Sequence, residues 1–81
     1  MTVRVLAFAR LREVLGFGER EVHLPMNATL EDLWMRVTAS APEAAALRPS
    51  TRFARNGALT DGSARLGDGD EIALMPPVGG G

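Results

Sequence analysis

Hydrophobic and polar residues alternate at the start of the chain. In the segment 3–9, one set of alternate positions is apolar throughout, and the other set includes Arg4 and Phe8. A period of two is typical of a β-strand. We therefore expect a first strand with one buried face, which carries Val3, Val5 and Ala7, and a second, partly apolar face.

A second alternating segment follows after a short interval. Residues 10–15 have the length of a helical turn, and Gly16 can close it because glycine adopts the left-handed conformation without strain. The alternating segment 21–24 then stops at Pro25, which cannot donate a hydrogen bond to a neighbouring strand. The first two strands are expected to pair as a hairpin.

The next segment has the spacing of an amphipathic helix. Its apolar positions follow the i, i+3, i+4, i+7 pattern: Leu30, Leu33, Trp34 and Val37. Thr29 is a good N-cap residue, and Asp32 three positions later lies near the positive end of the helix dipole. The helix should end near residues 40–41, because Pro42 disfavours a helical residue before it. Trp34 is expected in the core.

Three shorter strands are predicted in the last third of the chain. Residues 51–55 fit a strand with Phe53 directed inward, and Asn56-Gly57 is a strong tight-turn signal that lets residues 58–59 pair back. The segment 71–75 alternates once more, with Ile72 and Leu74 on one face. The resulting order predicts an α+β fold, with a mixed sheet of four to five strands packed on one main helix.

Composition excludes several classes of chemistry. The 81 residues suffice for one small domain, and a net charge of −1 provides no basic excess for nucleic acid. The chain has no cysteine, every basic residue other than His23 is arginine, and His23 is the sole histidine. A thiolate nucleophile, a lysine Schiff base and a cysteine-based metal site are therefore excluded. No apolar segment reaches the length of a membrane span. We expect a cytoplasmic protein that binds neither nucleic acid nor membrane.

The C-terminal end has an unusual composition. Residues 76–81 are Pro76, Pro77, Val78, Gly79, Gly80 and Gly81. Consecutive prolines are stiff and extended, and glycines without Cβ atoms can thread a narrow channel in a partner. Six extended residues span at most about 20 Å. This tail can carry the terminal carboxylate of Gly81 into another protein's active site, although a frayed terminus without function gives the same pattern.

Two motifs together resemble a known family. The segment Leu66-x-Asp68-Gly69-Asp70-Glu71-Ile72-Ala73, followed by Pro76-Pro77-Val78-x-Gly80-Gly81, resembles the small, sulfur-carrying subunits of molybdopterin synthase. Further matches are Arg10-Leu11-Arg12-Glu13 after the first strand and Asn56-Gly57 ahead of Leu59. The resemblance covers the whole chain; the departures are the missing lysines and Met75, where an aromatic residue is common. It implies a β-grasp (ubiquitin-like) domain over 1–75 and a flexible C-terminal tail over 76–81.

The resemblance also implies a function without a catalytic side chain. An E1-like adenylyltransferase/sulfurtransferase would use ATP to adenylate the Gly81 carboxylate and then convert it to a thiocarboxylate. The molybdopterin synthase large subunit would hold the pterin precursor that receives the sulfur in molybdenum cofactor biosynthesis. The chain itself would bind no cofactor and no metal.

A partner requires a surface on this chain. If the single helix covers one face of the sheet, Phe8, Leu59 and Met75 lie together on the open face, where the resemblance also places them. An apolar patch there, bordered by Arg10, Arg12 and Arg55, suits a protein interface.

Three alternatives stay open at this stage. The chain could carry sulfur for another pathway, such as thiamine synthesis or tRNA thiolation, although those carriers usually lack Pro-Pro-Val before the glycines. It could be a ubiquitin-like modifier joined through Gly81 to lysines of target proteins. It could also be an interaction module for which the tail has no importance.

Overall fold

The structure, a computed structural model, describes residues 1–77, and residues 78–81 lie outside the described part. Its strands and helices are β1 (Thr2–Ala7), α1 (Ala9–Leu15), β2 (Glu19–His23), α2 (Leu30–Thr38), α3 (Pro42–Ala45), the 3-10 turn η1 (Arg48–Ser50), β3 (Arg52–Arg55), β4 (Ala58–Thr60) and β5 (Glu71–Met75). The predicted succession of two strands, a main helix and three further strands is confirmed.

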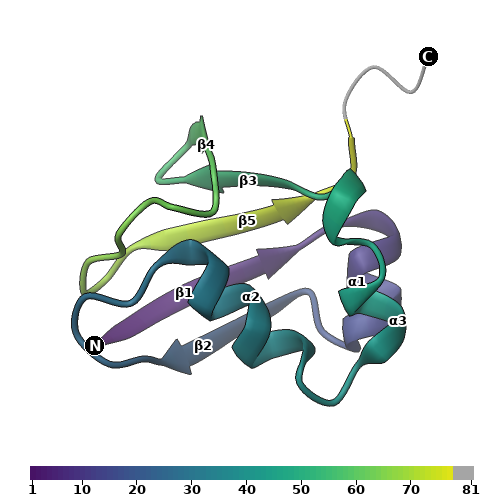
Figure 1. Cartoon of the computed structure of the whole chain (residues 1–81), viewed down its shortest axis with the longest axis horizontal. Coiled ribbons are helices and arrows are strands. Elements are labelled where there is room, and N and C mark those ends of the chain that lie inside the picture. Colours follow the sequence, from purple (N-terminus) through teal and green to yellow (C-terminus); the bar gives the residue numbers. More distant parts are fainter. Residues whose placement is uncertain (78–81) are drawn as a thin grey trace.

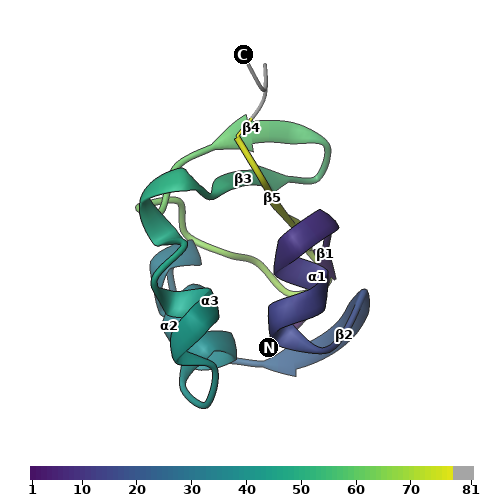
Figure 2. The same cartoon turned by 90° about the vertical axis from the view of Figure 1, so that its right-hand side faces the viewer.

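All five strands join one sheet in the order β2-β1-β5-β3-β4 (Figure 1). β1 and β5 are parallel, whereas the pairs β1–β2, β3–β5 and β3–β4 are antiparallel. The helices α2 and α3 lie on one side of this sheet (Figures 1 and 2). The α+β class, with a mixed sheet on one main helix, is therefore confirmed. The C-terminal strand β5 lies in the middle of the sheet.

The core fills the space between the sheet and α2. The inward side chains of the sheet are buried: Val3, Val5, Ala7, Val22, Phe53, Ile72 and Leu74. They pack against Leu30, Leu33 and Trp34 of α2. The ring centroid of Trp34 lies 6.0 Å from that of Phe53. Each large apolar side chain buried there contributes about 1.5–3 kcal/mol. The predicted helical stripe is thus the face that packs on the sheet, with Val37 half-buried at its end.

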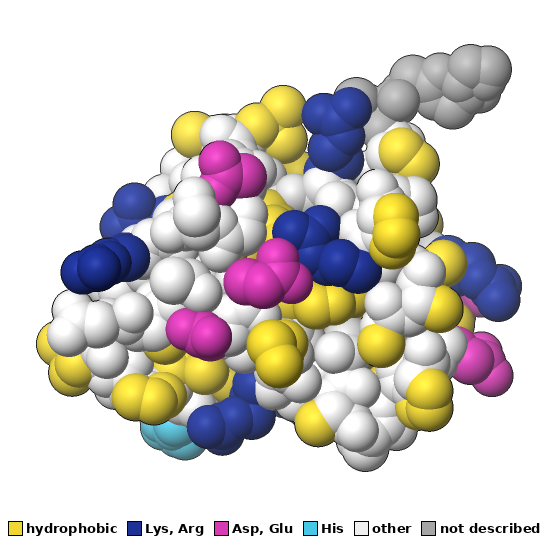
Figure 3. Space-filling model, in the orientation of Figure 1, with side chains coloured by type: hydrophobic (Ala, Val, Ile, Leu, Met, Phe, Trp, Pro, Cys, Tyr) yellow, Lys and Arg dark blue, Asp and Glu magenta, His cyan; other side chains and the backbone are white. Residues whose placement is uncertain are grey.

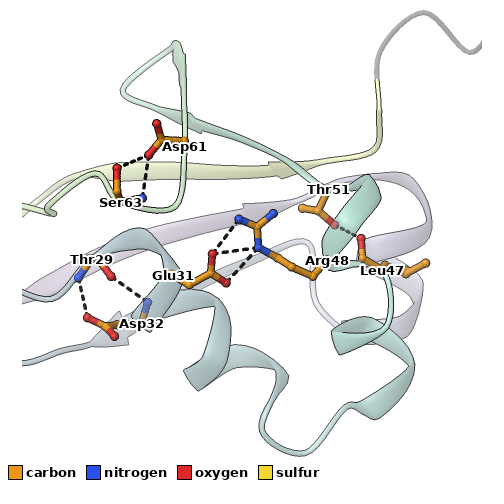
Figure 4. Close-up of polar contacts among 8 residues, drawn as sticks. All are labelled: Thr29, Glu31, Asp32, Leu47, Arg48, Thr51, Asp61 and Ser63. Atoms are coloured by element: carbon orange, nitrogen blue, oxygen red, sulfur yellow. Dashed lines mark hydrogen bonds and ion pairs between the residues drawn. The ribbon is translucent and has the colours of Figure 1, made fainter.

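The start of α2 is a capping box, as Thr29 and Asp32 predict (Figure 4). The Asp32 amide donates to the Thr29 hydroxyl at 3.2 Å, and the Thr29 amide donates to the Asp32 carboxylate at 2.8 Å. Two backbone donors that the helix leaves without partners are therefore satisfied. The helix ends at Thr38, slightly before the expected residues 40–41, where the amide of Ala41 turns back to the Thr38 carbonyl at 3.0 Å.

The first strand is shorter than the alternation suggests. β1 ends at Ala7, and Ala9 already has a left-handed φ of 52° as the first residue of α1. The alternating pattern runs past the strand because Phe8 remains extended and its amide donates to the Leu74 carbonyl at 3.2 Å. The two strands pair antiparallel, as predicted, with α1 between them. Gly16 ends α1 in the left-handed conformation, with φ 82°.

Candidate functional site

The base of the predicted tail lies at the end of β5 (Figure 1). Up to Met75 this strand is paired with β1 on one side and with β3 on the other. Pro76 and Pro77 follow directly and are exposed. Neither can donate a backbone hydrogen bond, so the ladder cannot continue beyond Met75. The predicted tail residues Val78, Gly79, Gly80 and Gly81 lie outside the described residues.

A buried carboxylate fixes the start of β5. Asp70 is 8% exposed and accepts hydrogen bonds from Arg55 Nε at 2.7 Å, from Asn56 Nδ2 at 3.0 Å and from the Gly67 amide at 2.7 Å. Burial by itself raises the pKa of Asp70, but these donors outweigh it and hold the pKa below its ordinary value. Asn56 also exchanges two hydrogen bonds with the backbone of Glu71. The strand that leads into the tail is therefore anchored at its first residues.

The sheet face opposite α2 carries an apolar patch. Strand register places four side chains in one row across β1, β5, β3 and β4: Leu6, Ala73, Ala54 and Leu59. A second row, nearer the tail, contains Met75 and the extended Phe8. Phe8 is 46% exposed and Leu59 is 62% exposed, while Met75 is half-buried. The three side chains chosen from the sequence therefore share one face, which we call the open-face patch, with Leu6, Ala54 and Ala73 forming its floor.

Charged residues border this patch on the side away from the tail. Arg4 forms an ion pair with Glu71 and lies 3.6 Å from Glu19, one step along the strands from Leu6. Arg55 does not belong to the border, because it alternates with Ala54 and its guanidinium binds Asp70. The expectation that Arg55 borders the patch is therefore wrong.

Arg12 lies on α1, which joins β1 to β2. Its exposed side chain passes so close to Gly18 that a Cβ added there would be 3.1 Å from Arg12 Nε. Together with Ala9, Glu13, Gly16, Phe17 and Gly18 it lines a shallow hollow. Contact between Arg12 and a partner stays a prediction.

The described residues contain no candidate metal centre. Among residues 1–77, no three His, Cys, Asp or Glu side chains are grouped closely enough to hold an ion. His23 is exposed and shares a 2.9 Å hydrogen bond with the Thr2 hydroxyl. None of the helices in this part of the chain is both long and apolar enough to cross a bilayer.

One feature near the tail was missed by sequence reasoning. A groove of about 230 Å³ lies at the tail base, lined by Arg10, Leu11, Leu47, Ser50, Thr51, Pro76 and Pro77. Its walls come from three segments far apart in the sequence, so no periodicity or motif marks it. In the patch floor, alternation already places Leu6 on the face of Phe8 and Ala73 on the face of Met75, whereas the position of Ala54 was not predicted.

The chain resembles known proteins along its whole length. Residues 5–81 match the ThiS family. The molybdopterin synthase sulfur carrier subunit of Chlamydomonas reinhardtii is 36% identical, with the alignment covering 100% of both chains. The human molybdopterin synthase sulfur carrier subunit is 33% identical over 98% of this chain and 93% of its own length.

Solved structures agree with these matches. SAMP1 from Haloferax volcanii superposes with a TM-score of 0.83 at 29% identity, over 100% of both chains. A chain in the complex of subunits 1 and 2 of the molybdopterin-converting factor from Helicobacter pylori gives 0.63 at 29% identity, also over 100% of both chains. A ubiquitin from Caldiarchaeum subterraneum gives 0.64 at 21% identity over 100% of this chain and 98% of its own, which confirms the ubiquitin-like β-grasp fold. The chain therefore belongs to the ThiS family, within which its full-length matches place it among the molybdopterin synthase sulfur carrier subunits.

Proposed function

We propose that this chain is the sulfur carrier of a molybdopterin synthase and that the carboxylate of Gly81 is the atom group that carries the sulfur. The observation that supports this most is the position of the tail base. Pro76 and Pro77 leave the centre of an anchored sheet and lie next to an exposed apolar patch that contains Phe8 and Met75. The folded domain can therefore bind a partner while it directs the tail into that partner's active site.

The proposed chemistry begins with activation of the carboxylate. A carboxylate is a poor electrophile because its oxygen leaves badly. An E1-like protein uses ATP to join the Gly81 carboxylate to AMP, with release of pyrophosphate. A sulfide-level sulfur nucleophile then attacks the acyl carbon, AMP leaves, and loss of the proton on sulfur gives the thiocarboxylate. ATP is bound by that activating protein, and this chain needs no cofactor of its own.

Sulfur transfer follows in a second complex. The thiocarboxylate sulfur, ionised at neutral pH, attacks a carbon of the pterin precursor and displaces an oxygen leaving group, so that a carbon–sulfur bond replaces a carbon–oxygen bond. Water then hydrolyses the acyl–sulfur bond, which leaves the sulfur on the precursor and returns the Gly81 carboxylate. Acid and base groups for these steps come from the large subunit. The Helicobacter pylori structure is named as a complex of two such subunits, which supports a large-subunit partner here. The open-face patch is the surface that we assign to it, with Leu59 and Phe8 as its most exposed apolar members.

Reconstitution tests this function. The chain is incubated with the activating protein, ATP and a sulfur donor, and its intact mass is measured before it is mixed with the large subunit and the pterin precursor. We expect the mass to change by the difference between sulfur and oxygen, and only the sulfur-loaded form to convert precursor. Deletion of Gly81 should abolish both steps while the thermal unfolding curve stays unchanged. Equal conversion by the loaded and unloaded forms rules the function out.

A protein modifier is the second candidate. The match to SAMP1, named as a small archaeal modifier protein, favours it because the two chains align over 100% of both with a TM-score of 0.83. A modifier forms an amide bond between its C-terminal carboxylate and a lysine of a target. Tagged chain expressed in its own host then migrates with larger proteins in covalent adducts, which depend on Gly81. A carrier alone gives the sulfur-loaded monomer without such adducts.

A further inference from the structure

The groove at the tail base lies on the other side of the sheet from the open-face patch. Its lining residues Leu11 and Leu47 belong to or pack against the core between the sheet and the helices. Figures 1 and 2 show the end of β5 beside α1 and the 3-10 turn η1, the elements that supply these residues. A partner that encloses the tail at Pro76 must therefore pass over this groove as well as over the patch.

The groove is preformed. Its floor contains Leu11, which is 2% exposed, and Thr51, whose hydroxyl donates to the Leu47 carbonyl at 2.8 Å (Figure 4). Arg48 holds η1 against α2, since its Nη2 lies 2.7 Å from a Glu31 carboxylate oxygen and its guanidinium stacks on a core aromatic ring at 4.3 Å. A rigid apolar groove binds with little loss of conformational entropy.

The size of the groove limits what can occupy it. Its volume of about 230 Å³ is smaller than the roughly 300–1,000 Å³ typical of sites for separate small ligands. Its lining is mostly apolar, and Arg10 and the exposed Ser50 are among its polar residues. One large apolar side chain from another protein fits this space and this chemistry.

Two arginine side chains flank the tail base. Arg10 lines the groove, and Arg52 is exposed beside Met75 on the opposite side of the tail. Within residues 1–77 neither forms an ion pair, whereas Arg4, Arg48 and Arg55 each do. Of the two, Arg10 alone lines the groove, and a positive charge beside an apolar groove is complementary to a protein surface that places a carboxylate beside an apolar anchor.

We infer that the groove is a second docking point for the protein that receives the tail. It takes one apolar side chain of the large subunit, and an acidic side chain next to it pairs with Arg10. This inference rests on the proposed function. The rest of the helix side of the molecule provides no continuous apolar surface for a broader interface, because its apolar side chains are scattered among charged ones (Figure 3).

Two variants and two matched controls test the groove. Ser50→Trp fills its mouth, and Arg10→Glu reverses the charge at its rim. Met35→Trp introduces the same aromatic side chain, and Arg36→Glu makes the same charge reversal, at exposed positions of α2 that do not line the groove. The dissociation constant for the purified large subunit is measured by calorimetry with the unmodified carboxylate form, so that sulfur loading is not required. Thermal unfolding checks that each variant is folded.

We expect Ser50→Trp to weaken binding about thirtyfold. Arg10→Glu should weaken it about tenfold, and the dissociation constant of this variant should depend less on salt concentration than that of wild type. Both controls should stay within about twofold of wild type. If Ser50→Trp does not fold, Arg10→Glu alone decides. Unchanged binding by the groove variants overturns the inference and leaves the proposed function intact. Failure of the wild-type chain to bind the large subunit rejects the function and the inference together.

Discussion

At the residue scale, the position of the tail depends most on the side chain of Asp70. Its carboxylate joins two earlier segments to the residue just before β5, since Arg55 and Asn56 donate to it from the end of β3 and Gly67 donates from the following loop. The Asp-Gly-Asp pattern predicts a turn, and a turn is present. Alternation and turn propensity carry no information on which of the two aspartates is buried. That choice depends on Arg55, which comes from a strand paired with β5 only in the folded chain.

Acid stability should depend on Asp70. Because its folded pKa is held below the ordinary value of 3.8, its contribution is complete above about pH 4 and is lost as the pH falls through the folded pKa. We predict that Asp70→Asn lowers the unfolding free energy at pH 7 by about 1–3 kcal/mol and flattens the loss of stability below pH 4. Urea titrations followed by Trp34 fluorescence measure both effects. An acid slope identical to that of wild type contradicts this role.

Thr29 sets the start of the main helix. Replacing it with alanine removes the hydroxyl that accepts the Asp32 amide, and we expect a loss of about 1 kcal/mol. Thr60→Ala is the control, because Thr60 is exposed on the edge strand β4 and makes no capping bond. Equal losses in the two variants, measured by chemical denaturation, argue against a capping role.

At the scale of elements, α2 shows what a periodic pattern can predict. The spacing of Leu30, Leu33 and Trp34 gives the element, its buried face and its first residue, because these features depend on neighbours within two turns. The parallel pairing of β1 with β5 could not be read in this way. It joins segments about 70 residues apart, and both have the same alternation that an antiparallel pair would have.

Alanine substitutions at two nearby positions on α2 should differ sharply in their effect on stability. Leu33 is fully buried, and Leu33→Ala should cost about 2–5 kcal/mol through lost burial and the cavity left behind. Met35 on the same helix is 65% exposed, and Met35→Ala should change the unfolding free energy by less than about 0.5 kcal/mol. Similar costs at both positions, determined by urea denaturation, contradict the assigned helix face.

The edge strand β4 offers the sharpest test of the open-face patch. Leu59 pairs with Ala54 on the open face, whereas the next residue, Thr60, pairs with Phe53 and points to the other face. We predict that Leu59→Glu weakens large-subunit binding about tenfold or more, while Thr60→Glu leaves it nearly unchanged. Neither exposed substitution should alter thermal stability greatly. Equal affinities of the two variants remove Leu59 from the interface.

At the scale of the whole molecule, the fold arranges two surfaces around one exit point. The C-terminal strand lies between β1 and β3, so the chain leaves from the centre of the sheet with the open-face patch on one side and the groove on the other. The patch could be predicted from Phe8, Leu59 and Met75, since alternation assigns faces once the helix side is known. The groove could not, because Leu11, Thr51 and Pro76 come together only in the complete tertiary structure.

The central claim is that Gly81 carries sulfur and gives it to another protein's substrate. The most direct measurement is a single turnover with chain loaded with isotopically labelled sulfur, large subunit in excess and pterin precursor. We predict that the label leaves the chain and appears in the pterin product, and that the chain returns to its original carboxylate mass. Label that stays on the chain while product forms, or product formed at the same rate by the unloaded chain, contradicts it.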